Sequence, residues 1–187
     1  GLSKAEVYMS YYHDLFERLT AYSGINYRIR TYKNYQEQNI VRDTIVKIMT
    51  DYDFFAQLLS PKDKRLHFRI QCPKCGVANK TYNELFHAVL DDNVRFEACC
   101  PIHGKYIVNV NKSNQDFLDM NTQLRDLTKG VLLNSYNENI LPIMLDGGDW
   151  AGVWTNRIHI RGLIRLGCEN IPLRLYAPLL LDWSGAK

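Results

Sequence analysis

Two copies of one short motif constrain this chain more than any other feature. Residues Cys72–Gly76 read C-P-K-C-G, and residues Cys100–Gly104 read C-P-I-H-G. Each copy sets two metal-capable side chains either side of a two-residue loop, with proline in the loop and glycine after it. Proline helps to set the turn, and glycine lets backbone amides approach a thiolate sulfur. Paired knuckles of this kind supply four soft or borderline ligands, which suits tetrahedral Zn²⁺ in a closed structural site. The predicted ligands are Cys72, Cys75, Cys100 and His103.

Two other interpretations of these residues remain open. The four side chains could form a chance pattern, although the repeated motif argues against chance. They could instead form disulfides, although His103 fills a position that a disulfide cannot use. Cys99 is either an alternative ligand or a small core residue, and the motif frame that starts at Cys100 favours the second. With Cys168 standing alone, the five cysteines fit a reducing compartment, so we expect a cytoplasmic protein.

Composition bounds the class of protein. The chain has 187 residues, of which 46% are hydrophobic and 23% charged, enough apolar mass for a real core. The net charge of +3 permits contact with nucleic acid but does not argue for it. No apolar run reaches the roughly 18 residues of a membrane span, so we expect no membrane partner.

The order of segments predicts three parts. We expect an α/β segment of a nucleotide-binding type of fold over residues 1–65, a zinc-ribbon insertion over 66–112 and a second α/β segment over 113–187. A ribbon of this size has a small core, so metal binding would supply much of its folding free energy. The chain starts with Gly1 rather than Met and stops at Lys187 just after a strand-like run. We therefore expect a piece of a longer protein.

Local patterns predict the elements of the first two parts. Ser3 and Glu6 form a capping box that opens a helix ending at Ser23-Gly24. A strand is predicted over 27–32 and a long helix over 36–59, stopped by Ser60-Pro61. In the ribbon we expect strands over 67–71, 95–98 and 106–110, and a short helix over 81–90.

The residue pattern of the last part, 113–187, predicts a helix followed by a strand, a helix and a strand. Ser113 caps an expected helix for which Gly130 is the C′ residue. A strand over 140–145 is broken at Gly147-Gly148, a helix follows over 150–166, and a second strand spans 173–181 with a bulge or edge at Pro178. Two strands joined through a helix by short links are typical of a βαβ unit in a parallel sheet.

Several of these segments, taken in order, resemble a known family. A Gly24–Tyr27 strand start precedes a long helix and then the paired knuckles. Asp149–Trp154 reads D-W-x-x-x-W shortly after Leu141-Pro142, and Leu181–Lys187 reads L-D-W-S-G-A-K. This order is similar to that of the class I lysyl-tRNA synthetases, in which a D-W-x-x-x-W stretch lies beside the amino-acid pocket. The final segment looks like the strand and G-x-K that open the family's KMSKS loop, with Lys187 as its first lysine.

The resemblance implies a fold and a function. It implies a partial Rossmann-type parallel sheet with an inserted zinc ribbon, and ATP-dependent activation of an amino acid, lysine by analogy, in the intact protein. ATP with Mg²⁺ and the amino acid would be the ligands, tRNA a further candidate partner, and Zn²⁺ a structural ion. The chain departs from the family in lacking a HIGH motif, in ending at Lys187 and in having Ile158 where the family has Asp before His. We therefore expect the chain not to form an adenylate alone, with Lys187 as its one catalytic candidate.

The resemblance also singles out substrate-binding residues. Asp149 could bind a substrate ammonium group by a charge-assisted hydrogen bond. Trp150 and Trp154 could line an aliphatic, positively tipped side chain, and His159 follows on the same predicted helix. Each has a structural alternative: Asp149 as a helix N-cap, the tryptophans as packed core, and His159 as a hydrogen-bonded structural residue.

Further charged residues allow weaker interpretations. Arg157, Arg161 and Arg165 form a basic stripe at helical spacing, either a solvated face or a contact to phosphate or a tRNA acceptor end. Asp146 ends a predicted strand, where α/β sheets often place ligand-binding groups. Two other functions remain open: a non-catalytic zinc-ribbon module that binds nucleic acid or protein, and a synthetase-like paralogue without activity.

Overall fold

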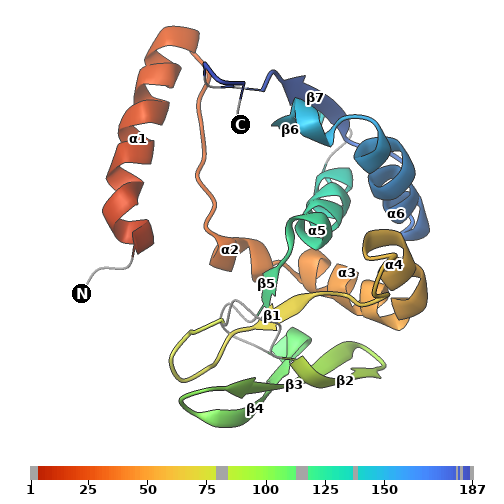
Figure 1. Cartoon of the computed structure of the whole chain (residues 1–187). Coiled ribbons are helices and arrows are strands. Elements are labelled where there is room, and N and C mark those ends of the chain that lie inside the picture. Colours follow the sequence, from red (N-terminus) through yellow and green to blue (C-terminus); the bar gives the residue numbers. More distant parts are fainter. Residues whose placement is uncertain are drawn as a thin grey trace. The chain divides into compact units, whose positions relative to one another are not determined.

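The structure of the chain is a computed structural model that divides into two compact units, residues 1–31 and residues 32–187 (Figure 1). It describes residues 4–78, 84–112, 118–136, 139–179, 181 and 183–185, and of Lys4, Ala5, Glu6 and Lys112 the backbone alone. None of the helices described there is long and apolar enough to cross a membrane.

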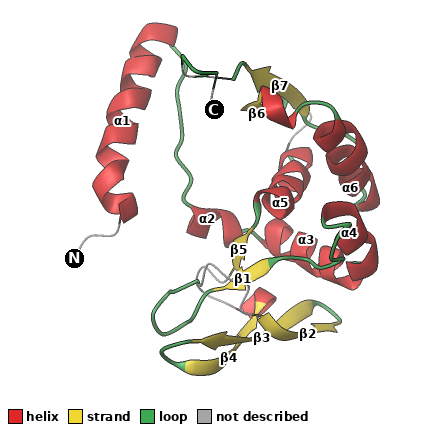
Figure 2. Ribbon diagram, in the orientation of Figure 1, coloured by secondary structure: helices red, strands yellow, loops and turns green. Residues whose placement is uncertain are grey.

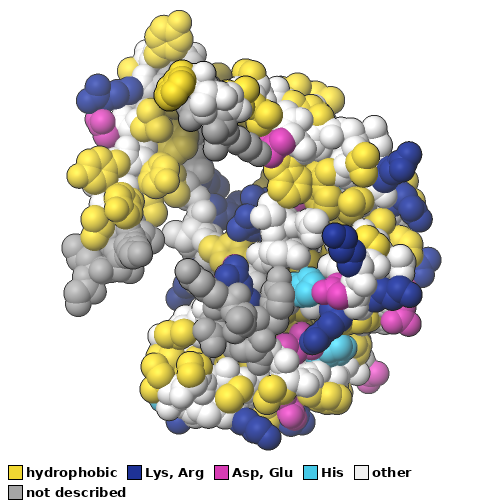
Figure 3. All heavy atoms as spheres, viewed as in Figure 1, with side chains coloured by type: hydrophobic (Ala, Val, Ile, Leu, Met, Phe, Trp, Pro, Cys, Tyr) yellow, Lys and Arg dark blue, Asp and Glu magenta, His cyan; other side chains and the backbone are white. Residues whose placement is uncertain are grey.

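The first unit is built on one long helix. Helix α1 spans Lys4–Ser23 and ends as predicted, with Gly24 in the left-handed region at φ 71°. Its tyrosines and aliphatic side chains are exposed, and Figure 3 shows hydrophobic side chains gathered along it. The predicted strand over 27–32 is wrong. Tyr27 instead packs back on α1, stacking on Phe16 at 5.2 Å and bonding to His13, and the next helix already begins at Tyr32.

Among the residues described, the larger unit contains four α-helices, a 3-10 turn over Val110–Lys112 and a helical segment after residue 147. The α-helices are α2 (Tyr32–Gln36), α3 (Asn39–Thr50), α4 (Tyr52–Leu59) and α5 (Thr122–Asn134), with α6 (Ile160–Arg165) closing the later segment. The single helix predicted over 36–59 is thus interrupted, because Asp51 adopts a non-helical backbone at φ −106° and ψ 43°. Its predicted end is confirmed, since Ser60 caps α4.

Three small sheets accompany the helices (Figure 2). Strands β1 (Phe68–Ile70) and β5 (Leu118–Met120) pair antiparallel, as do β2 (Glu84–Leu90), β3 (Asn93–Cys100) and β4 (Gly104–Asn109) in the order β2-β3-β4. Strands β6 (Ile143–Gly147) and β7 (Leu173–Ala177) pair parallel. The chain is therefore a mixed α/β protein, and the predicted parallel pair is confirmed.

The β2-β3-β4 sheet shares its core with the helices. Val94, Phe96 and Ala98 alternate on the inner face of β3, and they belong to one buried cluster with Ile45 and Ile48 of α3. The short helix predicted over 81–90 is wrong for its described part, because Glu84–Leu90 pairs with β3 as a strand. Cross-strand pairing outweighs the weak helical period there. The boundaries predicted at residues 65 and 112 stay predictions.

Two glycines let α5 and α6 approach closely. A Cβ atom on Gly130 would lie 2.7 Å from Leu163 Cδ2 and 3.1 Å from His159 Nε2, and one on Gly162 would lie 2.5 Å from Leu127 Cδ2. Gly130 is thus inside α5, not its C′ residue as predicted, because helix packing needs the missing side chain. Asn121 caps this helix by accepting from the Leu124 amide, while the predicted cap Ser113 lies outside the described residues.

The connection from β6 to β7 is helical but irregular. A 3-10 turn covers Gly148–Trp150, a π-helical segment covers Trp154–His159, and α6 follows directly. The predicted regular helix over 150–166 is therefore correct in kind and wrong in its first half. Strand β6 is displaced from its predicted range of 140–145, whereas β7 begins at Leu173 as predicted but ends at Ala177, just before Pro178. Figure 1 shows β6 and β7 side by side above α5 and α6.

Candidate metal centre and a buried polar cluster

The two knuckles are turns fixed by their glycines. Strand β1 leads to the first knuckle, and the second forms the tip of the β3–β4 hairpin, where Cys100 pairs with Gly104. Gly76 and Gly104 have φ values of 69° and 72°, a backbone region that other residues rarely adopt. In the first knuckle the Gly76 amide donates to the Cys72 carbonyl at 2.7 Å. The local sequence therefore brings the two side chains of each knuckle to the same side of a tight turn.

The four predicted ligand atoms converge. The sulfurs of Cys72, Cys75 and Cys100 and a nitrogen of His103 all lie within 4.8 Å of one another. His103 Nδ1 is 3.6 Å from Cys72 Sγ and 3.7 Å from Cys100 Sγ, and the Cys75 and Cys100 sulfurs are 3.8 Å apart. A tetrahedral zinc with bonds of about 2.3 Å to sulfur and about 2.0 Å to nitrogen separates its ligand atoms by roughly 3.5 to 3.8 Å. The group could therefore hold a structural zinc ion.

Backbone amides favour thiolates at two of these cysteines. Burial works to raise the pKa of Cys72, but the amides of Lys74 and Cys75 outweigh it and hold that pKa below its usual value. The pKa of Cys100 is likewise lowered, because the Ile102 and His103 amides oppose its burial. Thiolates are the form that binds zinc.

The other cysteines stand apart from this group. A sulfur–sulfur distance of 3.8 Å between Cys75 and Cys100 is far longer than the ~2.05 Å of a disulfide, and every cysteine is a free thiol. Cys99 is half-buried on β3, whose alternation turns it away from Cys100. Among the described residues, it does not join the converging set. Cys168 is buried in the core, which raises the pKa of its thiol.

The structure brings two of the predicted substrate residues together in the interior. Trp154 and His159 are both buried at the ends of the π-helical segment, and Trp150 contacts Trp154 edge to face at 5.1 Å. Asp149 is exposed and lies within the 3-10 turn whose N-cap is Gly147, so the N-cap alternative for Asp149 is wrong. Core packing of the tryptophans agrees with their structural alternative, and their contact with a substrate stays a prediction.

A buried ionic cluster that sequence reasoning missed surrounds His159. Arg174 of β7, whose side chain is 4% exposed, pairs with Asp146 of β6 and lies 3.5 Å from Asp126 Oδ2 of α5. His159 Nε2 is 3.2 Å from the Asp126 carbonyl oxygen. Burial lowers the pKa of His159 to about 4, and the charge of Arg174 adds to this. The one available signal was a polar residue inside each apolar strand, Asp146 and Arg174.

The remaining predicted residues lie elsewhere. Lys187 is outside the described residues. The three arginines of the basic stripe are exposed, and Arg165 pairs with Asp51 while its guanidinium lies 5.1 Å from the Phe54 ring centre. This contact gives Arg165 a structural role at the α4–α6 junction.

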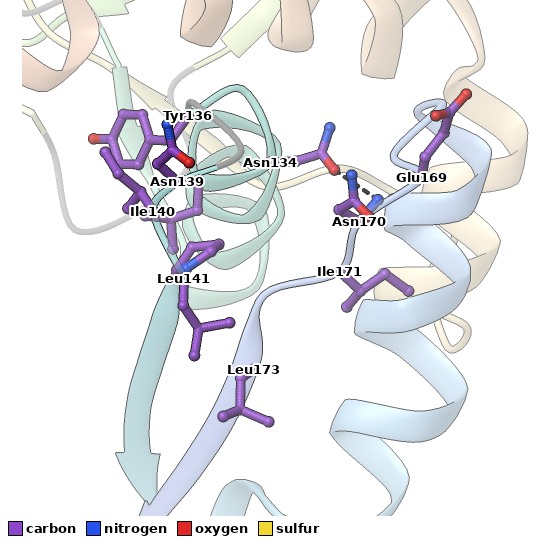
Figure 4. A pocket seen from close by; sticks show the side chains of 11 residues that line it. Asn134, Tyr136, Asn139, Ile140, Leu141, Glu169, Asn170, Ile171 and Leu173 are labelled. Atoms are coloured by element: carbon purple, nitrogen blue, oxygen red, sulfur yellow. Dashed lines mark hydrogen bonds between the residues drawn. The ribbon is translucent and has the colours of Figure 1, made fainter.

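An open cleft lies at the amino ends of β6 and β7 (Figure 4). Its volume is about 820 Å³, and Asn134 closes one side by accepting a hydrogen bond from the Asn170 amide at 2.9 Å. Ligands of parallel α/β sheets bind at the opposite, carboxyl ends of the strands, so we assign no ligand to this cleft.

Comparison with known proteins finds no matching family, no matching curated protein and no matching solved structure. The function proposed below therefore rests on the residues themselves and on the order in which they occur.

Proposed function

We propose that the chain is a zinc-stabilised part of a class I aminoacyl-tRNA synthetase-like protein, of the lysine type, that activates its amino acid with ATP when intact. In this proposal the Cys3His group holds one structural Zn²⁺, and the parallel pair β6–β7 is part of a Rossmann-type sheet. The observation that carries it is the polar turn Asp146–Asp149 at the carboxyl end of β6, in a chain that also contains the Cys3His group.

The position of this turn supports a ligand site. Open α/β sheets bind ligands beyond the carboxyl ends of their strands. Asp146 and Gly147 are the last two residues of β6, Gly148, Asp149 and Trp150 form the 3-10 turn after it, and Trp154 begins the π-helical segment. Acidic and aromatic groups in this place suit a substrate with an ammonium group at the end of an aliphatic chain.

The chemistry of adenylation explains why the chain alone should be inactive. The amino-acid carboxylate attacks the α-phosphate of ATP and displaces pyrophosphate, and the protein mainly positions reactants and offsets negative charge. Of the groups that the resemblance assigns to this task, the chain contains Lys187 alone. Adenylation would thus need the HIGH-type histidines and further lysines of the intact protein, with Mg²⁺ accompanying ATP.

ATP–pyrophosphate exchange by the full-length protein, tested with each amino acid in turn, is the decisive experiment. We expect exchange that depends on lysine, or on another amino acid with a cationic side chain, and no exchange by residues 1–187 alone. Lack of exchange with every amino acid would contradict the proposal and favour an inactive paralogue or a binding module.

The surface of the ribbon favours one alternative, a non-catalytic zinc ribbon that binds protein. Leu85 and Phe86 of β2 are each 56% exposed, and Ile107 of β4 is 48% exposed. Phe86 and Ile107 both pair with Glu97 of β3, so they share the outer face of the sheet. Exposed apolar side chains that share one sheet face are a feature of protein-binding surfaces.

A further inference from the structure

Four buried polar atoms around Arg174 lack hydrogen-bond partners among the described residues, although one of them, Asp126 Oδ2, lies 3.5 Å from the Arg174 guanidinium. They are Asp126 Oδ2, Trp154 Nε1, His159 Nδ1 and Arg174 Nε. Exposure is 0% for His159, 5% for Asp126 and 8% for Trp154, so water does not satisfy them from the surface. Buried polar groups almost always have partners, and a group of four exceptions in one place calls for an explanation.

Hydrogen-bonding logic fixes the roles of these atoms. A carbonyl oxygen can only accept, so His159 Nε2 carries the proton that bonds to the Asp126 carbonyl. In neutral His159, Nδ1 is then an acceptor. The cluster therefore presents two acceptors, His159 Nδ1 and Asp126 Oδ2, together with two donors, Trp154 Nε1 and Arg174 Nε.

The cluster also carries an unbalanced charge. Asp126 and Asp146 are two carboxylates, and Arg174 is the cation that pairs with both. With His159 neutral, two carboxylates face one cation, and their side chains are 7% exposed for Asp126 and 19% for Asp146. An excess of negative charge in a largely buried place is costly unless a cation joins it. His159 does not supply that cation at neutral pH, because its burial lowers its pKa to about 4.

The backbone around the cluster is unusual in a way that points to function. The π-helical segment runs from Trp154 to His159 and so carries two of the four atoms. Segments of this kind are rare and occur frequently at functional sites. On the opposite helix, Gly130 lets His159 pack closely, because a Cβ atom there would lie 3.1 Å from His159 Nε2 and 2.7 Å from Leu163 Cδ2.

We propose that this cluster recognises an ammonium group, with Asp126 Oδ2 and His159 Nδ1 accepting its hydrogen bonds. Arg174 is a positioning residue that holds Asp126 and Asp146 in place. Asp126 is the carboxylate that accepts hydrogen bonds from the ammonium group. The inference rests on the proposed function for taking an amino acid as the ligand, and it applies equally to an α-ammonium and to a side-chain ammonium.

The test follows the nitrogen shifts of His159 in the zinc-loaded, ¹⁵N-histidine-labelled chain at pH 7. We expect free His159 to be the Nε2–H tautomer, and its Nδ1 shift to move on titration with L-lysine and with cadaverine, a diamine without a carboxylate. L-norleucine, which lacks the side-chain ammonium, separates the two sources: a response to norleucine assigns the α-ammonium, and its absence assigns the side-chain group.

Two matched variants test the role of Asp126. Asp126→Asn removes the charge and keeps the shape, and we expect it to weaken binding of the responding ligand at least tenfold, whereas Asp91→Asn, at an exposed residue of the β2–β3 turn, changes it less than twofold. The inference is overturned if none of the three ligands moves Nδ1, or if Asp126→Asn leaves the response unchanged. Should Asp126→Asn not fold, the wild-type titration still decides.

Failure of this inference and failure of the proposed function can be told apart. A full-length protein without exchange, combined with a His159 that responds to cadaverine, removes the proposed function and leaves the ammonium site. Lysine-dependent exchange combined with an unresponsive His159 removes the site and leaves the function.

Discussion

The metal centre and the ionic cluster of Asp126, Asp146, His159 and Arg174 each bring four polar side chains together, but they differ in how the sequence encodes them. Each knuckle carries its two ligands within one turn, so metal binding can be predicted from five consecutive residues. The cluster draws Asp126, Asp146, His159 and Arg174 from four different elements. Local chemistry can be read from a chain, whereas chemistry assembled by packing requires the fold.

The largest expected effect is the loss of the metal centre. Cys75→Ser removes one ligand, so we expect zinc content to fall from about one ion per chain to nearly none and the β2-β3-β4 sheet to lose its order. Structural zinc contributes roughly 10 kcal/mol or more in small modules. Elemental analysis and hydrogen exchange would measure both effects. Cys99→Ser is the matched control and should keep its zinc; equal loss in both variants would mean that the ligand set is wrong.

Removal of the Arg174 charge should have the second largest effect on stability. Arg174→Met leaves Asp126 and Asp146 buried without their cation, and we expect the free energy of unfolding to fall by about 3–5 kcal/mol. Urea denaturation would measure this, with zinc bound throughout. Arg165→Met, which breaks the exposed pair with Asp51, should change stability far less. Equal effects would mean that burial does not distinguish the two pairs.

Mild acid should lower the stability of the folded chain, because His159 is buried in its neutral form. The pKa of His159 is about 4 in the folded chain and about 6.5 when unfolded, so the unfolded state gains a proton first as pH falls. The contribution of His159 is complete above pH 6.5 and is lost towards pH 4. We expect a loss of roughly 2 kcal/mol between pH 7.5 and 5. Denaturation of the wild type and of His159→Asn at both pH values isolates the contribution of His159, because both proteins contain His103. An identical pH dependence of the two proteins would contradict the burial of His159.

The smallest expected effects separate two uses of glycine. Gly130→Ala places a Cβ atom 2.7 Å from Leu163, and we expect it to cost about 1–2 kcal/mol and to shift the His159 resonances. Gly104→Ala meets no atom within 4 Å but must adopt φ 72°, at about 1 kcal/mol. Denaturation midpoints would show both. A shift of His159 in the Gly104 variant would contradict the separation of the two regions.

These contrasts also explain what the sequence could predict. The knuckles, α1 and the parallel pair followed from local spacing and turn residues, because each signal lies within one segment. The strand predicted over 27–32 failed because Tyr27 packs on α1 instead of on a sheet, and the helix predicted over 81–90 failed because β3 offered a partner. Gly130 was mistaken for a helix end because its role depends on α6, a helix distant in sequence. The roles of Asp126 and Arg174 depend on the same packing.

Zinc K-edge X-ray absorption on the purified chain tests the metal centre most directly. We predict one zinc ion per chain with three sulfur neighbours at about 2.3 Å and one nitrogen neighbour at about 2.0 Å. A chain purified without zinc, or a zinc shell of four sulfurs, would contradict the ligand set on which the proposed architecture depends.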